Sequence, residues 1–193
     1  MHSWTSVGRI LIGLLWIGWA VYWIIAARHN LTNRRTESLL TGASYRVLLI
    51  IGILLLALPV HSQTLLDAFV WPPSALMVTI GLAMTIIGLA IAVWARRHLG
   101  RYWSGRITLK VDHRVIQTGP YALVRHPIYS GILLALFGTV ITIGTVQSCL
   151  GLAMMFLSFV RKLTLEERWL CTDLGSEYEE YRHRVKALIP YLV

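Results

Sequence analysis

Charged residues are scarce in this sequence, and acidic residues are the scarcest of them. The chain has 9 Asp and Glu residues against 18 Lys and Arg residues, and all charged residues together make up 14% of its 193 positions. About 25% is usual for a soluble domain. Hydrophobic residues reach 56%, and the mean hydropathy is +0.62. This composition excludes an ordinary water-soluble domain and indicates a single membrane-embedded domain over residues 1–193.

Several chemical signatures are also missing. The sequence has no G-x-G-x-x-G motif, so a Rossmann-type methyltransferase is not supported. It has no pair of His residues four positions apart and no C-x-x-C, and its 2 Cys residues do not suggest a disulfide framework. We therefore predict no metal. A metal enzyme stays an alternative, because four side chains can in principle converge in space: His113, His126, Glu166 and Glu167.

The basic residues that give the chain its net charge of +9 lie between apolar runs. This placement is typical of membrane orientation and of attraction to anionic lipid headgroups, so membrane lipids are expected partners and nucleic acid is not. Four Lys or Arg residues lie in 28–46, none in 61–74, seven in 96–125 and six after residue 160. Because positive loops stay inside, we expect the N-terminus outside and the active site and C-terminus on the cytoplasmic face.

The apolar runs predict an all-α integral membrane protein with about five transmembrane helices, since a crossing takes about 20 residues. We place the spans at residues 7–27, 45–60, 75–95, 128–144 and 145–160. The 33 residues of 128–160 contain no Asp, Glu, Lys or Arg and would form a helix of about 50 Å. A tight hairpin that turns near Gly144 and Thr145 is therefore expected, with Gly131, Ala135 and Gly138 allowing close helix approach.

The loop at 96–127 combines turn residues with ionisable ones. Gly119 and Pro120 mark a turn, and Pro127 suits the first turn of a helix. Arg125 and His126 would then lie at the N-terminus of that helix. The positive end of that helix can receive an anionic group. The alternative is a capped interfacial helix with a snorkelling arginine.

The C-terminal tail, residues 161–193, brings acidic residues close to the membrane. Glu166 and Glu167 follow the fifth span within two helical turns, and carboxylates near hydrocarbon are costly unless paired or hydrated. They are candidates either for a functional site or for an ion pair at headgroup level. Apolar residues then recur at spacings of 4, 4, 3 and 4, at Leu170, Leu174, Tyr178, Tyr181 and Val185. This predicts an amphipathic helix that continues through Gly175 and closes over the site or lies on the membrane.

Two blocks of this sequence resemble the isoprenylcysteine carboxyl methyltransferase family and its relatives, the small phospholipid N-methyltransferases. The first block runs from His113 to Gly131 and contains Gly119-Pro120-Tyr121 and Arg125-His126-Pro127-Ile128-Tyr129-Ser130-Gly131, similar to the family's G-x-Y and R-H-P-x-Y-x-G pattern. The second contains Glu166-Glu167, Leu170, Gly175, Tyr178, Tyr181 and Ile189-Pro190. Together the blocks span about half of the chain.

The resemblance implies that S-adenosylmethionine binds, and S-adenosylhomocysteine leaves, a pocket formed by the cytoplasmic loop and the C-terminal amphipathic helix. The cofactor contacts that it implies are Lys110, His113, Val115, Ile116, Tyr121, His126, Pro127, Tyr129 and Glu166, with Arg114 contributing by its backbone. It implies catalytic roles for Arg125, His126 and Glu167. A basic residue precedes the Glu pair near the substrate carboxylate in eukaryotic members, so Lys162 and the adjacent Arg161 are the expected substrate-binding residues.

The expected function is methyl transfer to a lipophilic acceptor from the bilayer, such as the carboxylate of a prenylated cysteine. A carboxylate or thiolate needs no general base, so alignment of the reacting atoms would be the main requirement. A phospholipid amine must lose a proton, which His126 or Glu167 can accept. Thiol methylation, a related sterol reductase, and a membrane transporter or scaffold also stay open, as does the oligomeric state. Trp and Tyr residues near the span ends are interpreted as interface anchors.

Overall fold

The computed structural model describes residues 2–29, 33–58, 64–72, 74–110 and 115–190. The long helices are α1 His2–Ala26, α2 Leu39–Ala57, α3 Ala75–Leu99, α4 Pro127–Ile143 and α5 Val146–Leu174. The short elements are η1 Ala27–His29, β1 Asn33–Thr36, η2 Leu65–Asp67, η3 Gly100–Tyr102, β2 Thr108–Lys110, η4 Gly119–Ala122 and α6 Ser176–Arg184.

The fold is that of a multi-pass membrane protein, and the expected all-α class is confirmed. Helices α1, α2, α3 and α5 are long and apolar enough to cross a membrane, and α4 is a shorter apolar helix of 17 residues. At 1.5 Å per residue α4 is about 26 Å long, slightly less than a hydrocarbon core of about 30 Å. Strands β1 and β2 pair antiparallel and add a small ribbon at one end of the bundle.

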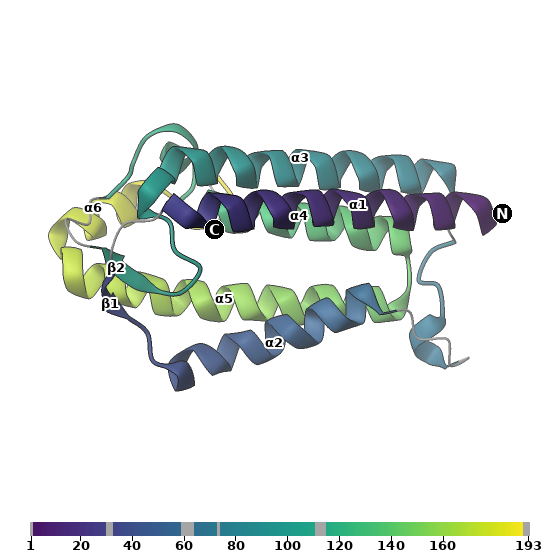
Figure 1. Cartoon of the computed structure of the whole chain (residues 1–193), viewed down its shortest axis with the longest axis horizontal. Helices are drawn as coiled ribbons and strands as arrows, with labels where there is room; N and C mark the ends of the chain where they lie inside the picture. The colour runs from purple at the N-terminus through teal and green to yellow at the C-terminus, as the bar shows by residue number, and fades with distance from the viewer. Residues whose placement is uncertain (1, 30–32, 59–63, 73, 111–114, 191–193) are drawn as a thin grey trace.

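The helices form two groups (Figure 1). Helices α1, α3 and α4 lie together, and α2 runs along α5 on the other side of the bundle. The turn between α4 and α5 is at Gly144, as expected, with a positive φ of 74° that favours glycine. After this turn the two helices pack mainly against other partners, α4 against α3 and α5 against α2.

Small residues allow α4 to approach another helix closely, as the sequence suggests, but that partner is α3 and not the other arm of the hairpin. A Cβ atom added to Gly131 would lie 2.6 Å from the carbonyl oxygen of Gly88, and one added to Gly88 would lie 2.4 Å from the backbone nitrogen of Ala135. Because backbone atoms cannot move aside cheaply, this contact requires glycine. This close contact with α3 thus helps to position the start of α4, where the R-H-P block lies.

Helix α2 starts earlier than the expected span. Ser38 caps it, accepting a hydrogen bond from the backbone nitrogen of Thr41, so the helix begins at Leu39 and contains Tyr45 in its second turn. Polar and charged residues precede Ser38 in the sequence, so the apolar run alone did not reveal the early start. The capped start brings Tyr45 near the pocket end of the bundle.

Helix α5 is longer than a membrane crossing requires. Its 29 residues extend about 44 Å, so its C-terminal turns project beyond the hydrocarbon core and carry Glu166 and Glu167. The expectation that the helix continues through Gly175 is wrong. Gly175 has a φ of +54°, which ends α5 and lets the chain turn into α6.

The apolar residues of the tail still form one cluster despite this break. Tyr178, Tyr181 and Val185 are buried, and Val115, Leu170, Cys171 and Leu174 pack against them. The residues that the sequence places on one helical face therefore meet because α6 folds back against the end of α5.

Candidate active site

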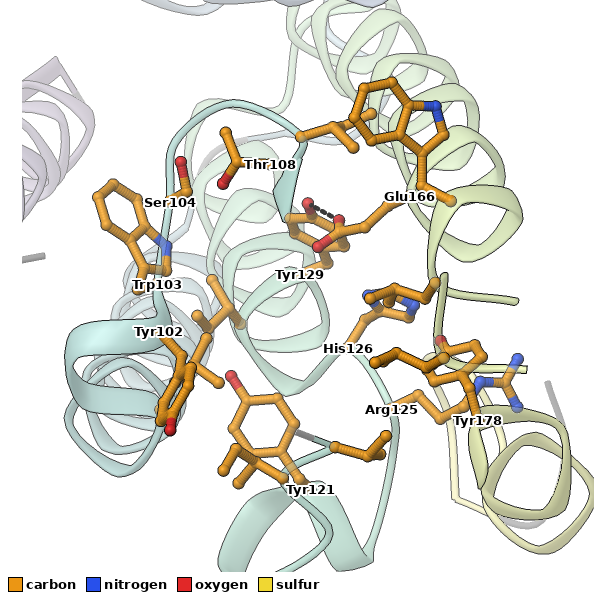
Figure 2. Close-up of a pocket in the computed structure, with 18 of the residues that line it drawn as sticks. Tyr102, Trp103, Ser104, Thr108, Tyr121, Arg125, His126, Tyr129, Glu166 and Tyr178 are labelled. Carbon is orange, nitrogen blue, oxygen red and sulfur yellow. Dashed lines mark hydrogen bonds between the residues drawn. The ribbon is translucent and has the colours of Figure 1, made fainter. Parts of the chain in front are cut away.

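A pocket opens where the end of α3, the start of α4 and the end of α5 meet α6 (Figure 2). Tyr102 and Trp103 lie on one side of it, and His126 and Glu166 on the other. The residues that line it are Leu99, Tyr102, Trp103, Ser104, Arg106, Ile107, Thr108, Val115, Ile116, Tyr121, Arg125, His126, Ile128, Tyr129, Glu166, Trp169, Leu170, Leu174, Tyr178 and Tyr181. Aromatic and aliphatic side chains dominate, with a few polar groups, which is typical of a small-molecule site.

Glu167 holds the R-H-P block in place from behind the pocket. The Nε and Nη2 atoms of Arg125 both lie 2.7 Å from its Oε1 atom, and the Nε2 atom of His126 lies 3.2 Å from the same oxygen. Arg182 approaches the other oxygen at 3.7 Å. The side chains of Arg125 and Glu167 are only 8% and 11% exposed. This nearly buried pair fixes the orientation of both Arg125 and His126.

The backbone of the C-terminal segment completes the same arrangement. The backbone nitrogens of Arg125 and His126 donate to the carbonyl oxygens of Lys186 and Ala187 at 2.8 and 2.9 Å. The Arg125 side chain also donates to the carbonyl of Val185. The start of α4 is therefore bound to the tail through main-chain hydrogen bonds as well as through Glu167.

Tyr129 positions Glu166 at the pocket surface. Its hydroxyl donates to the Oε2 atom of Glu166 at 2.7 Å (Figure 2). The ring of Tyr129 stacks on that of His126, with centroids 5.4 Å apart and planes 4° apart. His126, Tyr129 and Glu166 thus form a continuous polar and aromatic wall.

Buried phenols form the wall next to α6. The hydroxyl of Tyr181 donates to the carbonyl oxygen of Tyr121 at 2.6 Å. Burial raises the pKa of Tyr181 to about 12 and raises the pKa of both Tyr121 and Tyr178 further. All three side chains therefore stay neutral at physiological pH and add no negative charge to the pocket.

Comparison with known proteins identifies the family to which this chain belongs. The model of the isoprenylcysteine carboxyl methyltransferase (ICMT) family matches residues 80–172. A probable protein-S-isoprenylcysteine O-methyltransferase of Oryza sativa subsp. indica is 30% identical over 177 residues, which cover 89% of this chain and 88% of that protein. The chain belongs to the isoprenylcysteine carboxyl methyltransferase family. It is a methyltransferase, and the matched region contains both the R-H-P block and the Glu pair.

Other relatives of this methyltransferase have related names. Protein-S-isoprenylcysteine O-methyltransferase B of Arabidopsis thaliana is 24% identical over 187 residues, which cover 95% of this chain and 92% of the relative. Methanethiol S-methyltransferase 1 of Bradyrhizobium diazoefficiens is 39% identical over 124 residues, but these cover only 57% of this chain and 43% of that protein. The full-length similarity is thus to enzymes named for oxygen methylation, and a shorter similarity is to one named for sulfur methylation.

The pocket of this methyltransferase brings together most of the candidates that the sequence suggests. The following candidates line it: Val115, Ile116, Tyr121, Arg125, His126, Tyr129 and Glu166. Pro127 is buried as the first residue of α4 and does not line the pocket. His113 and Arg114 lie outside the described residues, and of Lys110 only the backbone, in β2, is described.

The remaining candidates lie beside the pocket. Glu167 is not among the lining residues and acts on Arg125 and His126 from behind. Arg161 is exposed and does not line the pocket. Lys162 lies nearby: its ammonium donates to the carbonyl oxygen of Gly105 at 2.9 Å and lies 5.5 Å from the ring centre of Tyr129. Of the two expected substrate-binding residues, only Lys162 is near the pocket wall.

The segment after α3 and the end of α5 supply lining residues that the sequence did not reveal. Tyr102 and Trp103 follow α3, Trp169 lies on α5, and all three line the pocket, although Trp and Tyr near span ends have the same sequence signature as interface anchors. The ring of Trp103 meets that of Trp23 edge to face at 5.5 Å, and the Arg96 guanidinium lies 4.5 Å above it. These contacts turn Trp103 inward. Among the described residues, no three His, Cys, Asp or Glu side chains gather as a metal site would need.

Proposed function

We propose that this methyltransferase uses S-adenosylmethionine to methylate the carboxylate of a lipophilic acceptor, such as an S-isoprenylated cysteine, that enters from the bilayer. The main observation behind this proposal is a pocket at one end of a membrane helix bundle that is lined by both the R-H-P block and Glu166. The full-length relatives named for O-methylation of protein-S-isoprenylcysteine support the acceptor class. The chain would act as one domain over residues 1–193.

The pocket residues fit S-adenosylmethionine by their chemistry. The Glu166 carboxylate suits a ligand ammonium group, and the aromatic rings of Trp103 and Tyr121 suit a sulfonium or an adenine. Within the described part of the chain, the hydroxyl oxygen of Thr108 is buried without a hydrogen-bond partner, so it is available to a polar ligand group. Val115 and Ile116 add apolar surface.

The protein's own contribution is positioning. S-adenosylmethionine supplies a methyl group that the sulfonium already activates, so a carboxylate acceptor needs no general base. Glu167 fixes Arg125 and His126, and Tyr129 fixes Glu166, so the polar wall is oriented before a ligand binds. Alignment of this kind can lower a barrier by several kcal/mol, and exclusion of water strengthens the local electrostatics.

We also propose that the pocket faces the cytoplasm. The pocket end of the bundle carries the basic clusters around Arg28, Arg96 and Arg101, whereas the opposite end carries η2 and a loop without Lys or Arg. Positively charged loops stay on the cytoplasmic side. The N-terminus would then lie outside.

The binding part of this proposal can be tested by calorimetry in nanodiscs with S-adenosylhomocysteine as the ligand. Wild-type protein should bind, whereas His126→Ala and Glu166→Gln should lose at least about tenfold in affinity, the loss expected for a charge-assisted hydrogen bond. His183→Ala and Glu180→Gln are matched controls, because both side chains are exposed on α6 and do not line the pocket. Absence of binding by folded wild-type protein would refute the proposal.

A second candidate is methylation of a small thiol. It is favoured by the 39% identity to methanethiol S-methyltransferase 1 over 124 residues that cover 57% of this chain. A thiolate also needs no general base once formed, so the same pocket suits it. The two candidates differ in product: a carboxyl methyl ester is hydrolysed by mild base to methanol, whereas a methyl thioether is stable.

A further inference from the structure

Two basic side chains beside the pocket have no carboxylate partner in the described part of the chain. Neither Arg106 nor Lys162 forms an ion pair there, whereas Arg125 and Arg46 are paired with Glu167 and Glu37. Arg106 lines the pocket and is exposed. A cation at a pocket wall that forms no ion pair with the protein is available to an anionic ligand.

The backbone before α2 holds Arg106 at this wall. The Nη2 atom of Arg106 donates to the carbonyl oxygen of Glu37 at 2.6 Å. The backbone nitrogen of Glu37 in turn donates to the carbonyl of Ile107 at 3.0 Å. A guanidinium carries five N–H donors, and this arrangement uses one nitrogen. Its other donors form no hydrogen bond with the described residues and can bind a planar acceptor such as a carboxylate.

The carboxylate of Glu37 does not neutralise Arg106. It accepts hydrogen bonds from the Tyr45 hydroxyl and from Arg46, the latter at 2.6 Å, and the residue is only 2% exposed. Arg46 is therefore the cation that compensates this buried charge, as a buried carboxylate requires. Arg106 donates to the main-chain oxygen of Glu37 and forms no ion pair with its carboxylate, so this carboxylate does not compensate the charge of Arg106.

Lys162 lies at the same edge of the pocket. Its ammonium donates to the carbonyl of Gly105, the residue before Arg106, at 2.9 Å. It also lies 5.5 Å from the ring centre of Tyr129, whose hydroxyl binds Glu166. Lys162 and Arg106 thus lie close together at residues 105–106, next to the wall that carries Glu166.

We propose that Arg106 binds the carboxylate of the acceptor beside Lys162, the substrate-binding residue that the family resemblance implies, and makes the enzyme select carboxylic acids over neutral acceptors. This inference rests on the proposed function, because it requires a carboxylate acceptor. Arg binds a carboxylate with two parallel hydrogen bonds, whereas Lys acts as a point charge. Methylation removes the negative charge, so the ester product loses this interaction and is released more readily than the acid.

The test compares two probes that differ only at this group: an N-acetylated, S-farnesylated cysteine and its methyl ester. Binding is measured by calorimetry in phosphatidylcholine nanodiscs with saturating S-adenosylhomocysteine. Wild-type protein should bind the acid about tenfold or more tightly than the ester. Arg106→Gln should lower the affinity for the acid to that for the ester and leave the affinity for the ester unchanged. Arg106→Lys should bind the acid with an intermediate affinity.

Arg101→Gln is the matched control, since Arg101 is an exposed arginine five positions earlier that does not line the pocket. It should bind both probes like wild type. Two results would overturn the role of Arg106. One is that wild type binds the acid and the ester with equal affinity; the other is that Arg106→Gln and Arg106→Lys each lose affinity for the acid and the ester equally. If wild type bound neither probe, the proposed carboxylate acceptor would be refuted, and this inference with it. That result differs from the two above, which refute the role of Arg106 alone.

Discussion

Replacement of Glu167 probes how the site is held together. This single carboxylate accepts from Arg125 at 2.7 Å and His126 at 3.2 Å, and approaches Arg182 at 3.7 Å. Its side chain is 11% exposed, so Glu167→Ala leaves the nearly buried Arg125 without a counter-charge. Breaking a buried pair in this way costs about 3 to 5 kcal/mol. Glu167→Gln keeps one hydrogen-bond acceptor and should cost less, about 1 to 3 kcal/mol.

The assay combines thermal unfolding with calorimetric titration of S-adenosylhomocysteine. Both variants should unfold at lower temperature than wild type, in the order Ala below Gln, and both should bind the ligand more weakly because Arg125 and His126 line the pocket. Glu180→Gln, on an exposed position of α6, should match wild type in both measurements. If Glu167→Ala retained wild-type unfolding and affinity, the positioning role of this carboxylate would be refuted.

Four further outcomes are expected. Tyr129→Phe should weaken S-adenosylhomocysteine binding severalfold in calorimetry, because Glu166 loses the 2.7 Å hydrogen bond that orients it; unchanged affinity would count against this role. Gly88→Val should lower the unfolding temperature, since its Cβ would lie 2.4 Å from backbone atoms of α4, whereas Gly18→Val, with no atom within 4 Å of its Cβ, should not. Because the pKa of Tyr181 rises from 10.0 to about 12 on folding, its contribution to stability is present below pH 10 and is lost as the pH rises towards 12; Tyr181→Phe should show a smaller loss over that interval in pH-dependent unfolding. With Cys149 and Cys171 replaced by Ser, Glu180→Cys should react with an impermeant thiol reagent only from the cytoplasmic side and Leu65→Cys only from outside, and the reverse pattern would overturn the proposed orientation.

The parts of the site with strong local chemistry could be predicted from the sequence. Pro127 marked the start of α4, and the acidic pair beyond the fifth apolar run marked Glu166, which lines the pocket. Both signals are local. Proline is favoured in the first turn of a helix because its missing N–H is not needed there, and a carboxylate next to hydrocarbon is costly unless a partner or a function retains it.

The parts that depend on long-range contacts could not be predicted. The hydrogen bonds from the backbone of Arg125 and His126 to Lys186 and Ala187 join segments about 60 residues apart and leave no side-chain signature. Trp103 looks like an interface anchor in sequence, and only its contacts with Trp23 and Arg96 turn it into the pocket. The sequence does not separate Arg106 from the other arginines of its loop, because its position depends on a hydrogen bond to the distant carbonyl of Glu37.

Transfer of a labelled methyl group tests the central claim most directly. Purified protein in nanodiscs is incubated with S-adenosylmethionine labelled in the methyl group and with the N-acetylated, S-farnesylated cysteine, and the extracted product is treated with mild base. The proposed function predicts label in the lipophilic product that base releases quantitatively as methanol. Label that resists base, or transfer only to a small thiol, would contradict carboxylate methylation, and no transfer to any acceptor by protein that binds S-adenosylhomocysteine would contradict the proposed acceptor class.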